Sequence, residues 1–252
     1  MTILCYHTVD PEWDSELAVK PGEFAAHCDW LVRNKTVIDL TEAVGRVDRT
    51  GKLPRGVTAM TFDDGFAGLH EHALPSLVRY GVPSTVFLVA ETLTPQGREV
   101  DWAPAGSGTL TLDEVGEMAE AGVSFGSHSY SHHNLTGLSD DELARDLRDS
   151  RTLLEDLLHR SVPFLAYPGG RHDARVRAAA RDAGYTHAFT LPDAPEPPGP
   201  YSIPRAGVYP GNGPAALRIK SSRWYLNVRT TKALPVLRGA ARRLSRSGTP
   251  HR

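Results

Sequence analysis

The chain of 252 residues contains 40% hydrophobic and 23% charged residues, proportions that indicate a folded globular protein and exclude disorder throughout. Its two cysteines are too few for a disulfide scaffold, and no apolar run approaches the roughly 18 residues of a membrane-spanning helix. The net charge of −2 is unevenly spread: residues 197–252 contain 11 Lys and Arg and no acid, which leaves 17 bases against 30 acids in residues 1–196. We therefore expect a folded domain over residues 1–211 and a basic C-terminal extension over residues 212–252.

Apolar runs of strand length alternate with segments of helical period along residues 1–211. The predicted strands are Thr2–Tyr6, Val37–Leu40, Val57–Phe62, Ser84–Val89, Val123–Gly126, Phe164–Tyr167, His187–Thr190 and Ser202–Pro204. The predicted helices are Pro21–Asn34, Thr41–Asp48, Leu69–Tyr80, Leu112–Ala121, Asp140–His159 and Ala174–Ala183. Two helices begin at capping boxes, Thr111–Glu114 and Ser139–Glu142, in which a hydroxyl and a carboxylate satisfy free backbone amides. Because strand–helix alternation implies parallel strands joined by right-handed crossovers, the sequence predicts an α/β fold, a closed (β/α) barrel of about seven strands.

Two adjacent aspartates, Asp63 and Asp64, directly follow the predicted strand Val57–Phe62. Active sites of (β/α) barrels lie at the carboxyl ends of the strands, so both carboxylates are expected where catalysis would occur. Neighbouring carboxylates are costly there unless a positive group neutralises them. The alternative is an Asp-Asp-Gly turn without a catalytic role.

Three histidines, His128, His132 and His133, follow the predicted strand Val123–Gly126. Neutral imidazoles are good ligands for zinc and similar divalent ions, whereas a solvated polar loop is the alternative. One aspartate and two histidines form a three-ligand set that leaves positions open for water and substrate, as catalytic metal sites do. The sequence therefore predicts one divalent metal ion. Zinc is the first expectation, and cobalt, nickel, iron or manganese suit the same ligands.

The predicted strand Phe164–Tyr167 ends in a Tyr-Pro-Gly-Gly turn that leads to Arg171. Glycines let the backbone approach a ligand closely, and an amide in such a turn could face a developing oxyanion. Taken alone, the same residues are typical of an ordinary strand-to-helix turn.

The three motifs, in this order and spacing, resemble those of the polysaccharide deacetylases of carbohydrate esterase family 4. The segments Leu4–His7 and Ile203–Arg205 are similar to the branch that deacetylates poly-N-acetylglucosamine. The resemblance spans residues 2–210 and implies a distorted (β/α) barrel that removes acetyl groups from sugars with a bound metal ion. The roles that it implies are a general base at Asp63, metal ligands at Asp64, His128 and His132, and an oxyanion-binding backbone amide at Tyr167.

The chain departs from the family pattern around the base and the metal. His133 stands where many members have proline after the second metal-binding histidine, so His132 or His133 could be the ligand, and the spacing favours His132. Many members also have an arginine two positions before the proline of the third motif, which orients the base. Ala166 occupies that position here, and Arg205 or Arg171 could substitute for the missing arginine.

The general acid is a third departure, because the late Leu-x-His that supplies it elsewhere in the family is not evident. His187 is the candidate by its place in the chain, although its register is poor and a structural role suits it better. His7, a metal-site histidine or the protonated Asp63 could supply the proton instead.

Together these roles predict a metal-dependent N-deacetylase acting on an N-acetylglucosamine-type sugar in a polysaccharide, a lipid-linked sugar or a glycosylated small molecule. The alternatives are an amidohydrolase for a non-sugar amide and a catalytically inactive sugar-binding module. The basic extension favours peripheral contact with an anionic membrane, or is a solvated terminus, and the acidic body disfavours nucleic acid as a partner. Since no secretory signal is visible, we expect a cytoplasmic or membrane-peripheral protein, with a location outside the cytoplasm left open.

Overall fold

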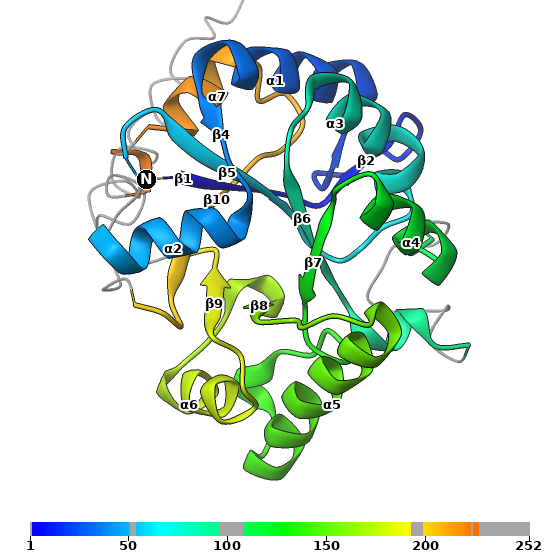
Figure 1. Cartoon of the computed structure of the whole chain (residues 1–252), viewed down its shortest axis with the longest axis vertical. Coiled ribbons are helices and arrows are strands. Elements are labelled where there is room, and N and C mark those ends of the chain that lie inside the picture. The colour runs from blue at the N-terminus through cyan, green and yellow to red at the C-terminus, as the bar shows by residue number, and fades with distance from the viewer. Residues whose placement is uncertain (1, 51–53, 96–107, 193–198, 223, 227–252) are drawn as a thin grey trace, which may run out of the picture.

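Seven parallel strands close into a barrel in the computed structural model, which describes residues 2–50, 54–95, 108–192, 199–222 and 224–226 (Figure 1). The ring runs β1, β10, β9, β8, β7, β6 and β5, and β5 pairs back with β1. Its strands are β1 (Thr2–Tyr6), β5 (Val57–Phe62), β6 (Ser84–Leu88), β7 (Ser124–Ser127), β8 (Phe164–Ala166), β9 (His187–Thr190) and β10 (Ile203–Gly207). The predicted α/β barrel of about seven strands is thus confirmed.

Short strands distort the ring. β4 (Thr36–Val37) pairs with the first two residues of β5, and β6 pairs with the last three residues of β5 along the same edge. β2 (Thr8–Val9) and β3 (Ala18–Val19) form a separate pair just after β1. The strand predicted at Val37–Leu40 is therefore shorter and displaced, and its last residue, Leu40, begins a helix.

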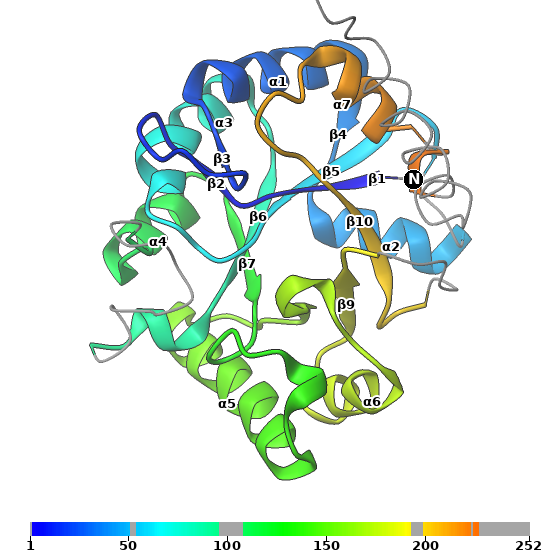
Figure 2. The ribbon, with the colours of Figure 1, turned by 180° about the vertical axis from the view of Figure 1, so that it is seen from behind.

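Helices surround the strands, as both views of the ribbon show (Figures 1 and 2). They are α1 (Pro21–Asn34), α2 (Leu40–Thr50), α3 (Leu74–Tyr80), α4 (Leu112–Glu120), α5 (Asp140–Leu158), α6 (Ala174–Asp182) and α7 (Pro214–Lys220). Both predicted capping boxes, at Thr111 and Ser139, are formed, so α4 and α5 begin where the sequence places them. The helix predicted from Leu69 begins instead as a π-helical turn, Leu69–Ala73, and becomes α3. Pro75 lies at this junction and has no N–H to continue the regular hydrogen bonding.

Side chains that alternate along the strands build two apolar layers. Ile3 faces the barrel interior with Phe87 and Phe189, whereas Leu4 belongs to the layer between strands and helices. A strand that is buried on both faces reads as a continuous apolar run, which is why the strand pattern was visible in the sequence. Residues Leu40, Ala43 and Val44 of α2 pack into the interior cluster. This helix closes the amino end of the barrel, so a site for a ligand is left at the carboxyl end.

The described part of the basic extension packs on the barrel. Leu217 of α7 is fully buried, Lys35 Nζ donates a hydrogen bond to Ser221 O (3.4 Å), and Thr2 Oγ1 donates one to Ser222 O (3.1 Å). The boundary predicted between the folded domain and the extension, at residues 211 and 212, thus lies just before α7, a short helix that contacts the barrel. Residues 227–252 of the predicted extension lie outside the described part. None of the helices in the described residues has both the length and the apolar character needed to span a lipid bilayer.

Candidate active site

A carboxylate and two imidazoles meet at the carboxyl end of the barrel. Asp64 follows β5, His128 follows β7, and His132 lies in the loop after it. Asp64 Oδ1 is 3.3 Å from His128 Nε2 and 3.2 Å from His132 Nε2. For metal–ligand distances of about 2.0–2.1 Å, the ligand atoms around a tetrahedral zinc ion are roughly 3.3 Å apart. The three residues that the sequence assigned to a metal therefore lie together, with a spacing and chemistry that suit a divalent ion.

Hydrogen bonding prepares His128 for a metal. Its Nδ1 lies 2.8 Å from Ala166 O, and because a carbonyl accepts but cannot donate, Nδ1 carries the proton. The Nε2, which faces Asp64, can then share a proton with that carboxylate or give its lone pair to a metal ion. Metal-ligating histidines are usually oriented by such a hydrogen bond from the other ring nitrogen. The side chains of His128 and Asp64 are 2% and 7% exposed and that of His132 is 22% exposed, so His132 is the member of the group most open to solvent.

Burial and charge act against each other in this group. Burial, the largest influence on Asp64, favours its neutral form, but hydrogen bonds from His128 and His132 outweigh it and hold the pKa of Asp64 well below its usual value. Burial also disfavours the charged form of His128, yet Asp63 and then Asp64 raise its pKa overall. The carboxylates therefore remain ionised at the end of the barrel, as ligands and bases must be.

Backbone strain is concentrated at the same place. Among the described residues, four that are not glycine have positive φ: Asp64 (72°), Ser129 (70°), His132 (59°) and His159 (51°). Three of the four belong to the aspartate motif or the histidine loop. A left-handed non-glycine residue costs on the order of 1–3 kcal/mol and persists where its surroundings hold it, which is typical of functional sites.

The structure separates the two candidate ligands that the sequence left open. His132 Nε2 faces Asp64, whereas His133 is exposed and its Nδ1 lies 2.6 Å from Ser131 Oγ. His132 therefore belongs to the group with Asp64, and His133 points to the exterior.

Asp63 lies beside this group in a buried ion pair with Arg205. The guanidinium donates from Nη1 to Oδ1 (2.6 Å) and from Nη2 to Oδ2 (2.7 Å), and both side chains are almost completely buried. Burial favours the neutral acid, but Arg205 and then His128 outweigh it, so the pKa of Asp63 is lowered. Arg205 thus occupies the role for which the sequence offered Arg205 or Arg171, because Arg171 is exposed. It positions the aspartate and has no described contact with the metal group.

Replacing Arg205 is expected to destabilise the fold strongly. Arg205→Met leaves the buried Asp63 carboxylate without its partner, which costs about 3–5 kcal/mol of unfolding free energy. Urea unfolding of the metal-free protein measures this, with Arg181→Ala as the control. Arg181 forms an exposed ion pair with Asp182, and such pairs contribute about 0–1 kcal/mol. Equal stabilities of the two variants would contradict the assignment of a buried pair.

That destabilisation should depend on pH. In the wild type the pKa of Asp63 is lowered, so the ion pair stabilises the fold above the usual aspartate pKa of about 3.9. Its contribution is lost as the pH falls from there towards the lowered folded pKa. In Arg205→Met, burial no longer has the guanidinium to oppose it and favours the neutral Asp63. The difference between the variant and the wild type should therefore be largest at high pH and shrink steadily on acidification. A difference that grows on acidification would contradict this.

Cys5 is a site residue to which the sequence analysis assigned no role. Its Sγ donates a hydrogen bond to Asp63 Oδ2 (3.3 Å), and burial raises its pKa well above the usual value, so it remains a neutral donor. The signal in the sequence was that Cys5 and His7 are two positions apart at the end of β1, so both side chains lie on the same face of the strand. β1 and β5 pair in register, with Cys5 opposite Thr61, which places both residues beside the aspartates.

The oxyanion role predicted for the Tyr167 amide is wrong. Tyr167 N donates to Phe189 O (3.1 Å) in the sheet, so its proton is already used. Pro168 has no N–H, and the N–H groups of Gly170 and Arg171 donate back within the turn. Among the described hydrogen bonds of this turn, Gly169 N–H has no acceptor, and its φ of 60° suits glycine.

The prediction of His187 as general acid is also wrong. His187 is the first residue of β9, paired in register with Phe164 at the start of β8, so it lies at the amino end of the barrel. There its Nε2 is 3.1 Å from Asp48 Oδ1 of α2. Because all strands of the ring are parallel, this end is opposite to the aspartates, and His187 is a structural residue.

His7 is the histidine next to Asp63. One nitrogen of His7, one carboxylate oxygen of Asp63 and the sulfur of Cys5 lie within 4.8 Å of one another. The Nδ1 of His7 is buried and has no hydrogen-bond partner, an unusual state for a polar atom inside a protein. His7 as a whole is half-buried.

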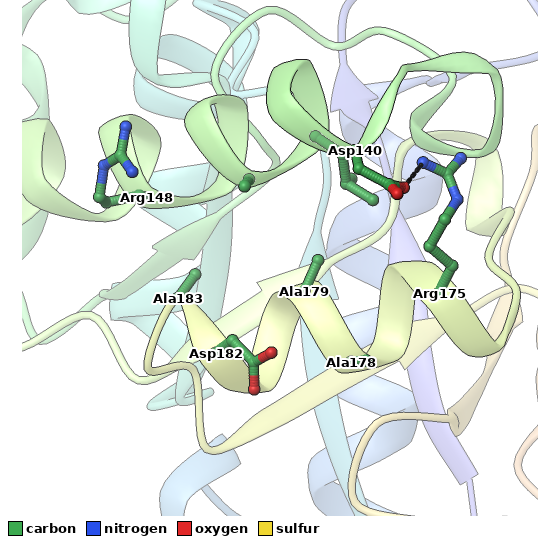
Figure 3. A pocket seen from close by; sticks show the side chains of 9 residues that line it. Asp140, Arg148, Arg175, Ala178, Ala179, Asp182 and Ala183 are labelled. Atoms are coloured by element: carbon green, nitrogen blue, oxygen red, sulfur yellow. Dashed lines mark hydrogen bonds and ion pairs between the residues drawn. The ribbon is translucent and has the colours of Figure 1, made fainter.

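A hollow elsewhere on the molecule does not contribute to this site. Figure 3 shows it between α5 and α6, next to Ala178, Ala179 and Ala183. Its volume is about 560 Å³. An ion pair between Arg175 Nη1 and Asp140 Oδ1 (2.9 Å) crosses its rim. The hollow lies on the outside of the barrel, and neither the metal group nor the Asp63 pair lines it.

Comparison with known proteins shows which proteins the chain is similar to. A family model described as polysaccharide deacetylase matches residues 50–188. YxkH of Bacillus subtilis (strain 168), named for the same family, is 28% identical over 214 residues, 84% of this chain and 72% of its own. The poly-beta-1,6-N-acetyl-D-glucosamine N-deacetylase of Staphylococcus aureus (strain MRSA252) is 24% identical over 200 residues, 75% of this chain and 67% of that protein. The solved Streptococcus pyogenes deacetylase PplD in complex with acetate superposes with a TM-score of 0.75 at 25% identity, covering 88% of this chain and 98% of its own.

Proposed function

Because this chain belongs to the polysaccharide deacetylase family, we propose that it is a metal-dependent N-deacetylase of an amino sugar. The observation that supports this most is the ionised Asp63, held by Arg205 directly beside the group of Asp64, His128 and His132. A sugar-binding module has no use for a free base next to a metal set. The sugar is of the N-acetylglucosamine type, in a polysaccharide, a lipid-linked sugar or a glycosylated small molecule, and the name of the Staphylococcus aureus relative supports this class.

The residues of the chain divide the work of amide hydrolysis. Asp64, His128 and His132 would hold a divalent ion, which supplies Lewis acidity towards the acetyl carbonyl and lowers the pKa of nearby water. Asp63 removes the proton of the attacking water, because it is ionised and is not needed as a ligand. Arg205 and Cys5 keep its carboxylate in place by three hydrogen bonds.

Two further roles follow from groups without partners. We assign the general acid to His7, whose buried Nδ1 has no hydrogen-bond partner and whose ring lies next to Asp63. A proton from this imidazole would go to the nitrogen of the departing amine. We assign the backbone donor to Gly169 N–H, in place of the engaged amide of Tyr167. Such a donor stabilises negative charge that develops on the acetyl oxygen.

Acetate release from N-acetylglucosamine oligomers tests the function. The protein is stripped with a chelator, reloaded separately with zinc, cobalt, nickel, iron or manganese ions, and incubated with oligomers and with an acetylated amino acid amide. We expect acetate from the oligomers in the loaded protein and none in the stripped one. Turnover of the non-sugar amide alone would indicate an amidohydrolase, and metal-independent sugar binding without acetate would indicate a binding module.

The basic extension is proposed to draw the enzyme to anionic surfaces at the membrane periphery. Residues 212–252 contain 10 Lys and Arg and no acid, and each base near an anionic bilayer contributes about 1 kcal/mol. Ile219 and Trp224, which are 60% and 59% exposed, offer apolar side chains next to these charges.

Truncation after Leu226 tests this role of the extension. A cut there leaves the buried Leu217 and the contacts of α7 in place. Acetate release from a soluble oligomer should be unchanged, whereas binding to phosphatidylserine vesicles should fall and lose its dependence on salt. Phosphatidylcholine vesicles are the control. Undiminished binding to anionic vesicles would contradict the proposal, as would loss of folding on truncation.

A further inference from the structure

The loop after β7 holds His132 in a conformation that its backbone does not favour by itself. His132 and Ser129 both have left-handed φ values, 59° and 70°, which non-glycine residues adopt rarely. His132 N donates a hydrogen bond to Ser129 Oγ (3.0 Å), so the two residues brace each other. Strained residues persist where the surrounding structure holds them, and the groups that hold this loop are therefore part of the metal site.

On one side the loop is fastened to the segment after β6. Ala90 N donates to Ser129 O (3.1 Å) and Glu91 N donates to Tyr130 O (2.9 Å). These bonds involve backbone atoms on both partners, so they are available to almost any sequence. They fix the carbonyls of the loop and leave its N–H groups and side chains to another partner.

On the other side that partner is Asp146 of α5. Its Oδ1 accepts a hydrogen bond from Tyr130 N (3.0 Å), and its Oδ2 accepts one from Ser131 Oγ (3.1 Å). Since the Ser131 proton goes to the carboxylate, the 2.6 Å contact between Ser131 and His133 is a donation from His133 Nδ1. One carboxylate thus fixes the two residues just before His132, and through Ser131 it engages His133 outside the site.

The surroundings of Asp146 indicate a specific role for the hydrogen bonds that it accepts. The carboxylate is half-buried, and burial raises its pKa against the opposing effect of the bonds from Tyr130 and Ser131. A buried carboxylate is costly unless hydrogen bonds satisfy it. Both of its oxygens are directed to the histidine loop, although α5 offers exposed positions where an aspartate would be free of that cost.

We propose that Asp146 is a positioning residue of the metal site, whose carboxylate fixes the loop so that His132 Nε2 lies against Asp64. The inference rests on the proposed metal-dependent function, because it assigns a ligand role to His132. Asp146 acts on His132 through its hydrogen bonds with Tyr130 and Ser131. Residues that orient metal ligands in this way typically change metal affinity by about 10–100-fold when they are removed.

Metal affinity measured without any turnover tests the proposal. Wild type, Asp146→Ala, Asp146→Asn and Asp149→Ala are titrated with Zn²⁺ against a chelating indicator and with Co²⁺ by its visible absorption. We expect Asp146→Ala to bind Zn²⁺ about 10–100-fold more weakly and to show an altered Co²⁺ spectrum. Asp146→Asn keeps an oxygen for Tyr130 N and should recover most of the affinity. Asp149, on the same helix, pairs with Arg148 at the surface, and Asp149→Ala should match wild type.

A second variant keeps the test decisive if Asp146→Ala does not fold. Ser131→Ala leaves α5 intact and removes the hydroxyl that contacts Asp146 Oδ2 and His133 Nδ1. We expect a loss of Zn²⁺ affinity near the lower end of the range for such residues, about tenfold. Unchanged affinity in every variant that folds, next to a wild type that binds tightly, would overturn this inference and leave the proposed function standing. A wild type that binds neither Zn²⁺ nor Co²⁺ would overturn both.

Discussion

His128→Ala is expected to lose both the bound metal and the release of acetate. His128 directs its Nε2 at Asp64 from a buried position, with Nδ1 bonded to Ala166 O and the side chain 2% exposed. His132 already faces the same carboxylate oxygen, so it cannot replace the lost imidazole. With two ligands left, a divalent ion loses a third of its protein donors and the geometry that catalysis requires. Metal content after gel filtration and acetate release from N-acetylglucosamine oligomers measure the two losses.

His133→Ala is the matched control for this prediction. It removes an imidazole from the same loop, but one that is exposed and bonded to Ser131. We expect it to keep stoichiometric metal and near wild-type turnover. If His128→Ala retains full metal and activity, or if His133→Ala loses both, the assignment of the ligands is wrong.

Asp63→Asn is expected to keep the metal and to lower turnover by roughly 10²–10⁴, the usual contribution of a general base. The amide cannot accept the proton of water, while Asp64, His128 and His132 keep their contacts with one another. Measuring metal content and kcat on the same preparation separates the two effects. Loss of metal from Asp63→Asn would show that the two aspartates share the ligand role.

This substitution also leaves the buried Arg205 without a countercharge, so stability must be followed in parallel. Asn can still accept one hydrogen bond from the guanidinium, yet the pair loses its charge. Turnover should therefore be measured at a temperature where urea unfolding shows the variant fully folded. Cys5→Ala, which removes a neutral donor from the same carboxylate, is a milder companion. It tests whether turnover follows the charge of Asp63 or its hydrogen bonds.

The sequence by itself determined the chemistry of the site and its place in the fold. Asp63, Asp64 and His128 could be assigned to one edge because each follows an apolar run, and parallel strands bring their carboxyl ends together. The strand pattern was readable since β1 and β5 are buried on both faces. The starts of α4 and α5 were equally local, because a capping box involves residues three positions apart. A match of three motifs in order then indicated the family, which the comparisons confirmed.

The tertiary structure alone decided which groups contact one another. Arg205 and Asp63 are 142 positions apart, and their pairing depends on the closure of the ring through β1, which no local pattern encodes. His187 was assigned wrongly although its strand, His187–Thr190, was predicted with the correct bounds, because the assignment followed order along the chain and not the end of the strand on which the residue lies. The amide of Tyr167 was misjudged because its acceptor, Phe189 O, belongs to the neighbouring strand. Local spacing therefore shows which residues lie on one face or at one end of an element. The hydrogen-bond partners across the barrel depend on the register between strands, and that register is set by all the strands that close the ring.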